Sequence, residues 1–168
     1  MNRRHLLGIP TLPLLTPATA TAIEPPTGAV VLTVSGLLRL PNLGSVGAFD
    51  MAMLAGMPQF SFHANTPWFS HTRKFTGPLL RDVLSAVGSQ GPKLHAVALN
   101  DYRVEIPAED AQRFDVIVAR LLDDKPMAVR DKGPLFIIYP FNDQAGLRNA
   151  VYFSRCAWQL KAIEVVAG

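Results

Sequence analysis

The stretch from Phe60 to Leu84 constrains the fold of this chain more than any other. Phe60 and Phe62 alternate with polar residues, and this period of two is typical of a half-buried β-strand. A polar and aromatic loop follows, and Gly77-Pro78 then predicts the start of a helix, because proline suits a first turn where no backbone N–H is needed. Gly88 predicts the left-handed residue that ends this helix. A strand, a polar loop and a helix in this order predict a scaffold that presents a site.

Short strand-like segments dominate the rest of the chain. Asp50 predicts the N-cap of a short helix, Pro107 predicts the start of another, and residues 149–155 fit either a helix or a strand. Apolar runs and period-two alternation predict further strands over residues 29–34, 94–99, 102–106, 115–122, 135–139 and 158–166. Many short strands with few short helices predict an α+β, β-rich domain.

Composition describes one compact domain without a nucleic-acid surface. The 168 residues are 49% hydrophobic and 17% charged, which is enough for a self-sufficient core. Arg3 and Arg4 near the N-terminus supply most of the net charge of +3, and the other basic residues form no stripe. We therefore expect no nucleic-acid partner.

Residues 1–22 have the organisation of an export signal peptide. A basic segment, MNRRH, precedes a modest apolar run, and ATATA supplies small residues for cleavage near Ala20 or Ala22. The apolar run is too short and too interrupted by proline to span a bilayer, so we expect no stable membrane span. Arg3-Arg4 resembles a twin-arginine signal, although an ordinary secretory leader fits equally well. Either route predicts a periplasmic or secreted protein, with residues 23–28 as a linker and residues 29–168 as the domain.

Cys156 is the single cysteine of the chain, so no intramolecular disulfide can form. Its apolar neighbours favour a small buried hydrophobe over a reactive or ligating thiol. The cysteine motifs of haem and iron–sulfur proteins are missing from the sequence. We therefore expect no electron relay of those kinds within this chain.

Four segments together resemble one protein family. The central stretch, ALNDYRVEIP at residues 98–107, GPLFIIYP at residues 133–140 and WQLKAIEV at residues 158–165 are similar in order and spacing to the molybdopterin-binding domain of sulfite-oxidase-type oxidoreductases. The resemblance covers residues 28–166. It implies a sulfite-oxidase-type molybdopterin-binding fold, with mixed β-sheets and a few short helices, and molybdopterin (the molybdenum cofactor) as the ligand.

Two positions depart from this family. The family's enzymes ligate molybdenum through a cysteine thiolate, and the equivalent position falls in residues 64–66, with Asn65 as the closest match. Neutral amide and hydroxyl oxygens are poor substitutes for a thiolate. The family also usually carries an arginine at the position of Phe136, and a phenyl ring cannot replace its bidentate recognition of an anion. The resemblance therefore implies the scaffold without its metal-ligating cysteine.

The loop after the central strand gathers candidate cofactor-binding side chains. Asn65 and Thr66 can hydrogen-bond a ligand, and Trp68 can either stack on a planar ring or cap the core. His63 and His71 can face a pocket, although such histidines are more often solvated or hydrogen-bonded than ligating. A paired-histidine metal site would need a third donor, and the loop contains no Cys, Asp or Glu. We therefore predict no metal ligands here.

A second candidate segment is the turn Asn100, Asp101 and Tyr102. It matches a turn that lies near the cofactor in the family. A plain hairpin turn with an inward tyrosine explains the same three residues equally well.

Basic residues near small or acidic ones form the last candidates. Asp131 and Lys132, together with Ser154 and Arg155, can bind a phosphate through charge and backbone N–H groups. Arg73-Lys74 can do the same from another side. Charged clusters of this kind are more often simply solvated loops.

Two functions from different classes follow. The first is a non-catalytic module that binds a pterin or another small anionic ligand. The second is a molybdopterin-dependent oxidoreductase that holds its metal by the cofactor dithiolene alone and exchanges electrons with a redox partner protein. The missing cysteine favours the module, whereas the leader favours the enzyme, because a bound cofactor would explain export in the folded state. No acid–base pair, Ser-His-Asp spacing or phosphate-binding loop supports a hydrolase or kinase.

Overall fold

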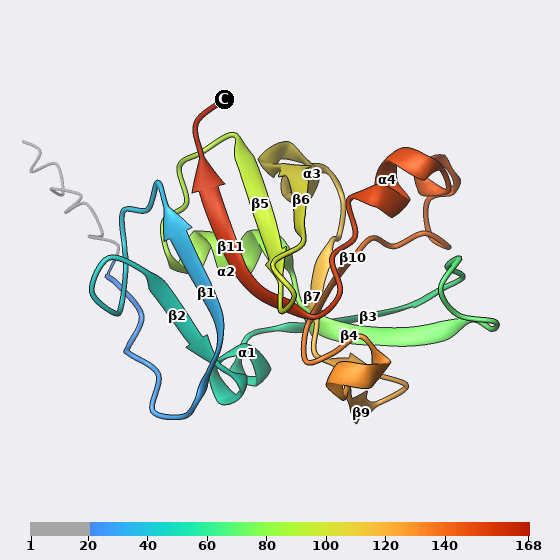
Figure 1. Ribbon diagram of the computed structural model, residues 1–168, viewed down its shortest axis with the longest axis horizontal. Coiled ribbons are helices and arrows are strands. Elements are labelled where there is room, and N and C mark those ends of the chain that lie inside the picture. Colours follow the sequence, from blue (N-terminus) through green and yellow to red (C-terminus); the bar gives the residue numbers. More distant parts are fainter. Residues whose placement is uncertain (1–20) are drawn as a thin grey trace, which may run out of the picture.

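The computed structural model describes residues 21–168, so the predicted leader lies almost wholly outside the described residues. This part of the chain has a strand-rich α+β fold with mixed sheets, and the predicted fold class is confirmed at that level (Figure 1). The strands are β1 (Val30–Gly36), β2 (Gly47–Asp50), β3 (Gln59–Ala64), β4 (Arg73–Pro78), β5 (Lys93–Ala98), β6 (Arg103–Pro107), β7 (Ile117–Ala119), β8 (Leu121–Leu122), β9 (Lys125–Pro126), β10 (Phe136–Ile138) and β11 (Leu160–Val166). The helices are α1 (Met51–Gly56), α2 (Leu80–Ala86), α3 (Ala108–Arg113) and α4 (Ala150–Ser154), with 3-10 turns η1 (Val129–Asp131) and η2 (Ala145–Leu147).

A five-stranded sheet forms one half of the fold. Its strand order is β2-β1-β11-β5-β6. β1 and β11 run parallel, and the other neighbours run antiparallel. β11 therefore lies in the middle of the sheet, between β1 and β5, as Figure 1 shows. The predicted hairpin of β5 and β6 is confirmed, and its turn is formed by residues 99–102.

Two smaller sheets form the other half. One has the order β3-β4-β8-β9, and the other pairs β10 with β7. The β3–β4 hairpin extends away from the five-stranded sheet toward α4 (Figure 1). Its far end carries the loop of residues 65–72, which brings the central candidate residues to the side of the molecule where α4 lies.

The helix predicted to start at Gly77-Pro78 begins later, because these residues complete β4 and α2 starts at Leu80. Packing against β7 explains the difference. A Cβ atom on Gly77 would lie 2.0 Å from the carbonyl oxygen of Val118, so only glycine permits this approach. At the other end of the helix, Gly88 has the predicted left-handed conformation, with φ +62°.

Residues 115–122 do not form the single strand that their apolar run predicts. The chain pairs with β10 over Ile117–Ala119 and then, beyond Arg120, with β4 over Leu121–Leu122. Arg120 lies between these pairings, and its side chain donates to Gln59 Oε1 at 2.8 Å. The segment that fits either a helix or a strand forms α4, with Asn149 as its N-cap.

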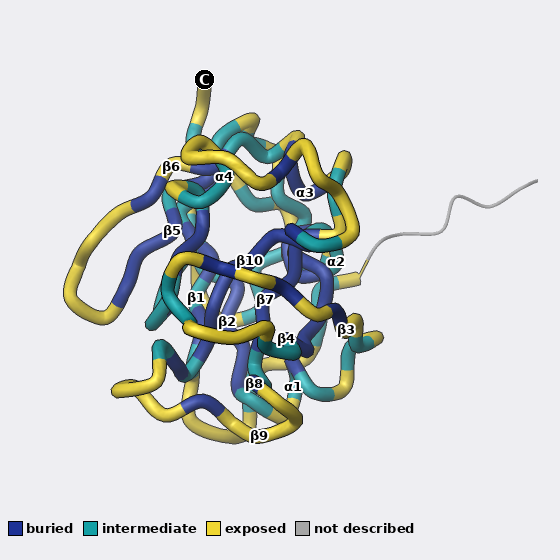
Figure 2. Tube along the Cα trace, turned by 90° about the vertical axis from the view of Figure 1, so that its right-hand side faces the viewer, coloured by how far each residue is buried: buried dark blue, intermediate teal, exposed yellow. Residues whose placement is uncertain are grey.

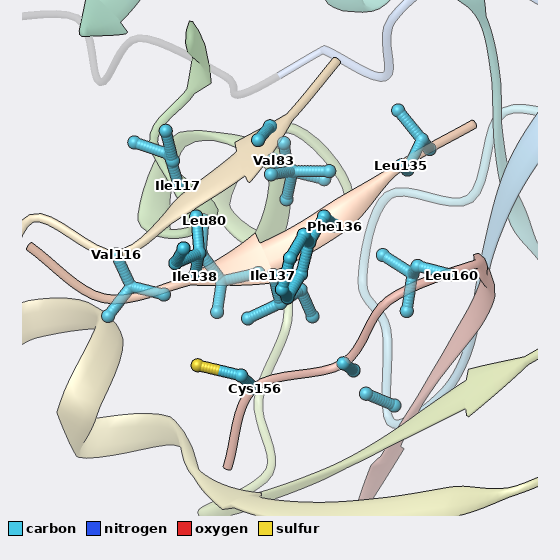
Figure 3. Close-up of a cluster of buried hydrophobic side chains, with 14 of the residues drawn as sticks. Leu80, Val83, Val116, Ile117, Leu135, Phe136, Ile137, Ile138, Cys156 and Leu160 are labelled. Carbon is cyan, nitrogen blue, oxygen red and sulfur yellow. The ribbon is translucent and has the colours of Figure 1, made fainter. Parts of the chain in front are cut away.

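The core joins the two halves of the fold. Buried residues, dark blue in Figure 2, run through β2, β7 and β10 and through much of β5. Leu80 and Val83 of α2 pack with Phe136 and Leu160 in one buried cluster, shown in Figure 3. The fully buried Tyr139 and Phe141 extend this cluster toward α4. The core thus supports the segments that surround the site described below.

The predicted linker, residues 23–28, has no regular secondary structure but is bound to the domain. The backbone N–H groups of Thr27 and Gly28 both donate to Asp50 Oδ2, at 3.1 and 2.8 Å. The other oxygen of Asp50 accepts from Met53 N at 2.8 Å and caps α1, as predicted. Among the described helices, none has the length and apolar character needed to span a membrane.

Candidate functional site

A hollow lined by aromatic side chains lies where the β5–β6 turn, the 65–72 loop and the end of α4 meet. It consists of two adjoining pockets of about 290 and 250 Å³ that share Tyr102, Cys156 and Trp158. We call it the aromatic hollow. The first pocket is also lined by Ala98, Asn100, Val104 and Ala157, and the second by Pro67, Trp68, Phe153 and Ser154. Mostly apolar walls with a few polar groups are typical of small-molecule sites.

Two tryptophans from distant parts of the chain form the centre of this wall. The rings of Trp68 and Trp158 pack edge to face, with centroids 5.3 Å apart. Phe136 packs against both rings from the core side, at 5.8 and 6.0 Å. Phe153 of α4 adds a further edge contact to Trp68 at 6.0 Å. Trp68 therefore both caps the core and lines the hollow, which unites the two alternatives that the sequence left open.

The predicted turn at Asn100 contributes two residues to the hollow and one residue elsewhere. Asn100 Oδ1 accepts from the backbone N–H of Tyr102 at 3.2 Å, and both side chains line the hollow. Tyr102 is 64% exposed, so its ring forms the outer rim. Asp101 instead pairs with Lys161 at 2.6 Å, and this hydrogen bond lowers the pKa of its carboxyl below the ordinary value. Asn100 and Tyr102 are therefore the members of the turn that a ligand can reach.

Ser154 and Arg155, at the end of α4, also have different roles. Ser154 lines the hollow, and its hydroxyl donates to the carbonyl of Val151 at 2.7 Å. Arg155 pairs with the buried carboxylate of Asp110 at 2.7 Å, and the same oxygen accepts from the Tyr139 hydroxyl at 2.8 Å. The structure thus places the Arg155 guanidinium in a structural network and not among the lining residues.

Most polar side chains of the central loop lie outside the hollow. His63 is exposed on β3 opposite Lys74, and His71 is exposed with its Nε2 3.1 Å from the hydroxyl of Ser70. The Asn65 side chain accepts from Thr72, and its backbone N–H donates to Asn142 at 3.0 Å. The sequence prediction grouped His63, Asn65 and His71 with Trp68, but the structure brings only Trp68 of these four to the wall of the hollow.

Thr66 differs from its neighbours in the loop because it is buried. The residue is 8% exposed, and its side-chain hydroxyl has no hydrogen-bond partner within residues 21–168. A buried hydroxyl without a partner is destabilising unless a bound molecule or ion satisfies it. Thr66 precedes Pro67 and Trp68, which line the hollow, but Thr66 itself lines neither pocket.

Asp131 is the last residue of η1, and Lys132 follows it as the C-cap. Asp131 is exposed and its carboxylate lies 3.5 Å from Arg130 Nε. The ammonium group of Lys132 lies 4.4 Å from the ring centroid of Trp158, within the range of a cation–π interaction. Lys132 lines neither pocket, but its ammonium group packs on the ring of Trp158, which lines both.

Cys156 lines both pockets but is chemically protected. Its residue is 4% exposed, its thiol lies 3.6 Å from the carbonyl oxygen of Tyr152, and Figure 3 shows it beneath the side chains of β10. Burial raises the pKa of this thiol well above its usual range, so it is protonated at neutral pH. The side chain acts as an apolar wall, in agreement with the sequence prediction of a small buried hydrophobe.

The donor atoms near the hollow determine whether these residues could hold a metal ion. Within the described residues, no group of three or more His, Cys, Asp or Glu side chains is placed to hold a metal ion. The loop at residues 64–66 offers no sulfur, and Cys156 offers a protonated thiol. The aromatic walls and the amide of Asn100 offer ring contacts and a hydrogen-bonding group to a planar heterocycle, whereas the hollow offers no thiolate to a metal.

Sequence reasoning missed seven residues that line the hollow: Pro67, Ala98, Val104, Phe153, Cys156, Ala157 and Trp158. A signal was present, because the segment 152–158 carries three aromatic residues around the cysteine. The directions in which these side chains point could not be assigned, because residues 149–155 fitted both a helix and a strand.

Comparison with known proteins leaves the site as the basis for assigning a function. No protein-family model matches this chain, and no curated protein matches it.

Proposed function

We propose that this protein binds a small planar ligand of the pterin class, or another small anionic ring compound, in the aromatic hollow. The observation that carries the proposal is the meeting of Trp68, Trp158 and Tyr102 around one cavity. Aromatic rings bind a planar heterocycle by stacking and edge contacts, and each such contact adds about 0.5–1.5 kcal/mol to the burial of apolar area.

The arrangement of the family-like segments supports the proposed kind of fold. ALNDYRVEIP supplies Asn100 and Tyr102, WQLKAIEV supplies Trp158, and GPLFIIYP supplies Phe136, which packs behind Trp158. Segments that are far apart in the sequence thus converge on one cavity. This convergence is expected if the chain has the sulfite-oxidase-type molybdopterin-binding fold, and that fold is part of the proposal.

The chemistry of the lining residues favours a binding module over an enzyme. Phe136 is fully buried against Trp68 and Trp158, so its position supplies an aromatic support where the family's enzymes carry a cation. Loop residues 64–66 provide amide and hydroxyl oxygens, which are hard donors unsuited to molybdenum. On this basis the protein retains the ring-binding part of the site and lacks the protein ligand of the metal.

The proposal includes export. The leader-like residues 1–22 suggest a periplasmic or secreted protein, and a folded cavity that receives its ligand before or after translocation is compatible with either export route. Fractionation of cells that express the full chain tests this part: cleavage near Ala20 or Ala22 and recovery outside the cytoplasm are expected.

Analysis of the protein purified from its own host tests the ligand. Molybdenum is measured by elemental analysis, and pterin by fluorescence after oxidation of the denatured protein. Near-stoichiometric pterin without molybdenum supports the binding module. Stoichiometric molybdenum with oxo-transfer activity would instead support the oxidoreductase that holds its metal by the dithiolene.

If the purified protein is free of ligand, its affinity for pterin is measured by calorimetric titration. Tyr102→Ala removes an exposed rim residue and should weaken binding by about tenfold without unfolding the protein. Phe60→Ala, which truncates a 39% exposed ring on β3 outside the hollow, is the matched control and should bind like the wild type. Equal affinities for all three proteins, or no binding to any, would contradict the proposal.

A further inference from the structure

Most cations that could assist an anionic ligand near the hollow are already paired with carboxylates. Arg155 pairs with Asp110, and Lys161 pairs with Asp101. The cations of β4 are paired as well, Arg73 with Asp123 and Lys74 with Asp124. Each of these charges is offset locally, so none of them is available to a ligand without breaking an existing ion pair.

Lys132 differs from these residues. Within residues 21–168, no carboxylate oxygen lies within ion-pair distance of its ammonium group, whose described contacts are the rings of Trp158 at 4.4 Å and Phe69 at 5.9 Å. A lysine ammonium is a strongly hydrated point charge on a flexible stem with three rotatable donors. The ammonium group can therefore pack on the indole and still turn one donor toward a ligand.

The backbone fixes Lys132 to the segment that forms the wall of the hollow. The carbonyl oxygen of Lys132 accepts from the backbone N–H of Gln159 at 2.9 Å, directly after Trp158. Its own N–H donates to the carbonyl of Val129 at 3.2 Å, and its backbone is left-handed, with φ 74°. The base of the side chain is thus held in place, and its position beside Trp158 does not depend on a mobile loop.

We propose that Lys132 binds the one negative charge of the ligand, and that the aromatic hollow selects a planar ring with a single carboxylate over neutral and phosphorylated rings. The inference rests on the proposed function and names its ligand class. A phosphate monoester carries between one and two negative charges and is usually bound by several donors. Here one unpaired cation lies beside mostly apolar walls, which matches one carboxylate.

Three pterins that differ in charge test this selection by calorimetric titration of the ligand-free full chain. The probes are pterin-6-carboxylate, neutral 6-methylpterin and neopterin monophosphate. The wild-type protein should bind the carboxylate about tenfold more tightly than the neutral ring, since a hydrogen bond to a charged group contributes about 1.5–3 kcal/mol. Added salt should reduce this preference, because screening weakens an exposed charge pair.

Lys132→Gln should abolish the preference for the carboxylate and leave the affinity for 6-methylpterin unchanged. Lys132→Arg should retain the preference, because it keeps the charge. Lys125→Gln is the matched control: it removes one positive charge from an exposed lysine on β9 and should change neither affinity.

The outcomes separate this inference from the proposed function. If the wild type binds pterins but Lys132→Gln keeps the preference, or weakens both ligands equally, the role of Lys132 is overturned and the binding function stands. Tighter binding of neopterin monophosphate than of pterin-6-carboxylate overturns the ligand class in the same way. If no pterin binds to the wild type, the proposed function and the inference both fail.

Discussion

The ring of Trp68, on the loop between β3 and β4, packs at an angle of 62° against the ring of Trp158, which precedes β11. These are the two tryptophans of the chain, and both line the aromatic hollow. Trp68 also contacts Phe136 and Phe153, so one side chain connects the loop, the core and α4. The stability of the domain and the shape of its cavity therefore depend on the same contact.

Trp68→Ala should destabilise the domain measurably even without ligand. The substitution removes three ring contacts and leaves a space in a half-buried wall, so we expect the free energy of unfolding to fall by about 2–3 kcal/mol. Phe60→Ala, which truncates a 39% exposed ring on β3, should lower it by about 1 kcal/mol or less. Chemical denaturation followed by circular dichroism measures both values. Equal losses for the two variants would show that Trp68 is not part of the packed structure.

Asp110→Ala should be among the most destabilising polar substitutions. It leaves the Arg155 guanidinium, 25% exposed, and the buried hydroxyl of Tyr139 without their shared acceptor. Breaking such a pair lowers stability by about 3 kcal/mol, whereas Tyr139→Phe, which removes one hydrogen bond, should lower it by about 1 kcal/mol. Burial raises the pKa of Tyr139 above its ordinary value, so its hydroxyl stays a donor through the whole range of native pH. A double-mutant cycle with additive losses would contradict coupling between Asp110 and Tyr139.

Acid should release the N-terminal connector through Asp50. The backbone N–H groups of Met53 and Gly28 hold the pKa of this carboxyl below its ordinary value of 3.8. A lowered folded-state pKa means that the stabilisation is complete above the ordinary pKa and is lost as the pH falls below it toward the folded-state value. Asp50→Asn keeps a cap for α1 but replaces the oxygen that binds the connector, so its stability should depend less on pH in this acid range. Denaturation midpoints at a series of pH values below 6 test this, and parallel curves for the two proteins would exclude the effect.

Cys156 should resist alkylation in the native state. Burial raises the pKa of its thiol and closes access to it, so a charged disulfide reagent should react at neutral pH only after denaturation. The cysteine lines both pockets, and a bound pterin should slow the reaction of a small neutral alkylating reagent further. Rapid native reaction at the rate of a free thiol would show that the wall of the hollow opens readily.

Gly77→Ala should disturb the contact between β4 and β7. The new methyl group would meet the Val118 carbonyl at 2.0 Å, and relief of this clash should lower stability by about 2–3 kcal/mol. Gly56→Ala is the control, because no atom lies within 4 Å of the added Cβ at the end of α1. Alanine is the better helix former, so this control should gain up to about 1 kcal/mol. The two variants should therefore shift the thermal midpoint in opposite directions.

The sequence predicted those parts of the fold that depend on neighbouring residues. The cap at Asp50, the turn at Asn100 and the left-handed Gly88 follow from local chemistry, and the structure contains all three. The wrong predictions depend on distant contacts. Pro78 belongs to β4 because Gly77 lies against Val118, and no periodicity in the local sequence records that approach.

Part of the candidate site could be predicted from the sequence. Of the residues predicted to bind a cofactor, Trp68, Asn100, Tyr102 and Ser154 line the hollow, and cofactor binding by them stays a prediction. The side chains of Arg155 and Asp101 take part in ion pairs with partners far away in the sequence, and such pairing is invisible until the fold places Asp110 and Lys161 beside them. Polar residues that are close in the sequence need not face the same side of the molecule. His63 and His71 are exposed and do not line the hollow.

The position of β11 has a consequence for how the protein is made. A strand that fills the centre of a sheet, yet follows the other described strands along the chain, leaves a ribosome-bound intermediate with two unjoined edges, on β1 and on β5. Trp158 and Cys156 come just ahead of that strand, so the hollow acquires these two walls only when the sheet closes around β11. Closure of the five-stranded sheet and completion of the hollow are therefore one folding event.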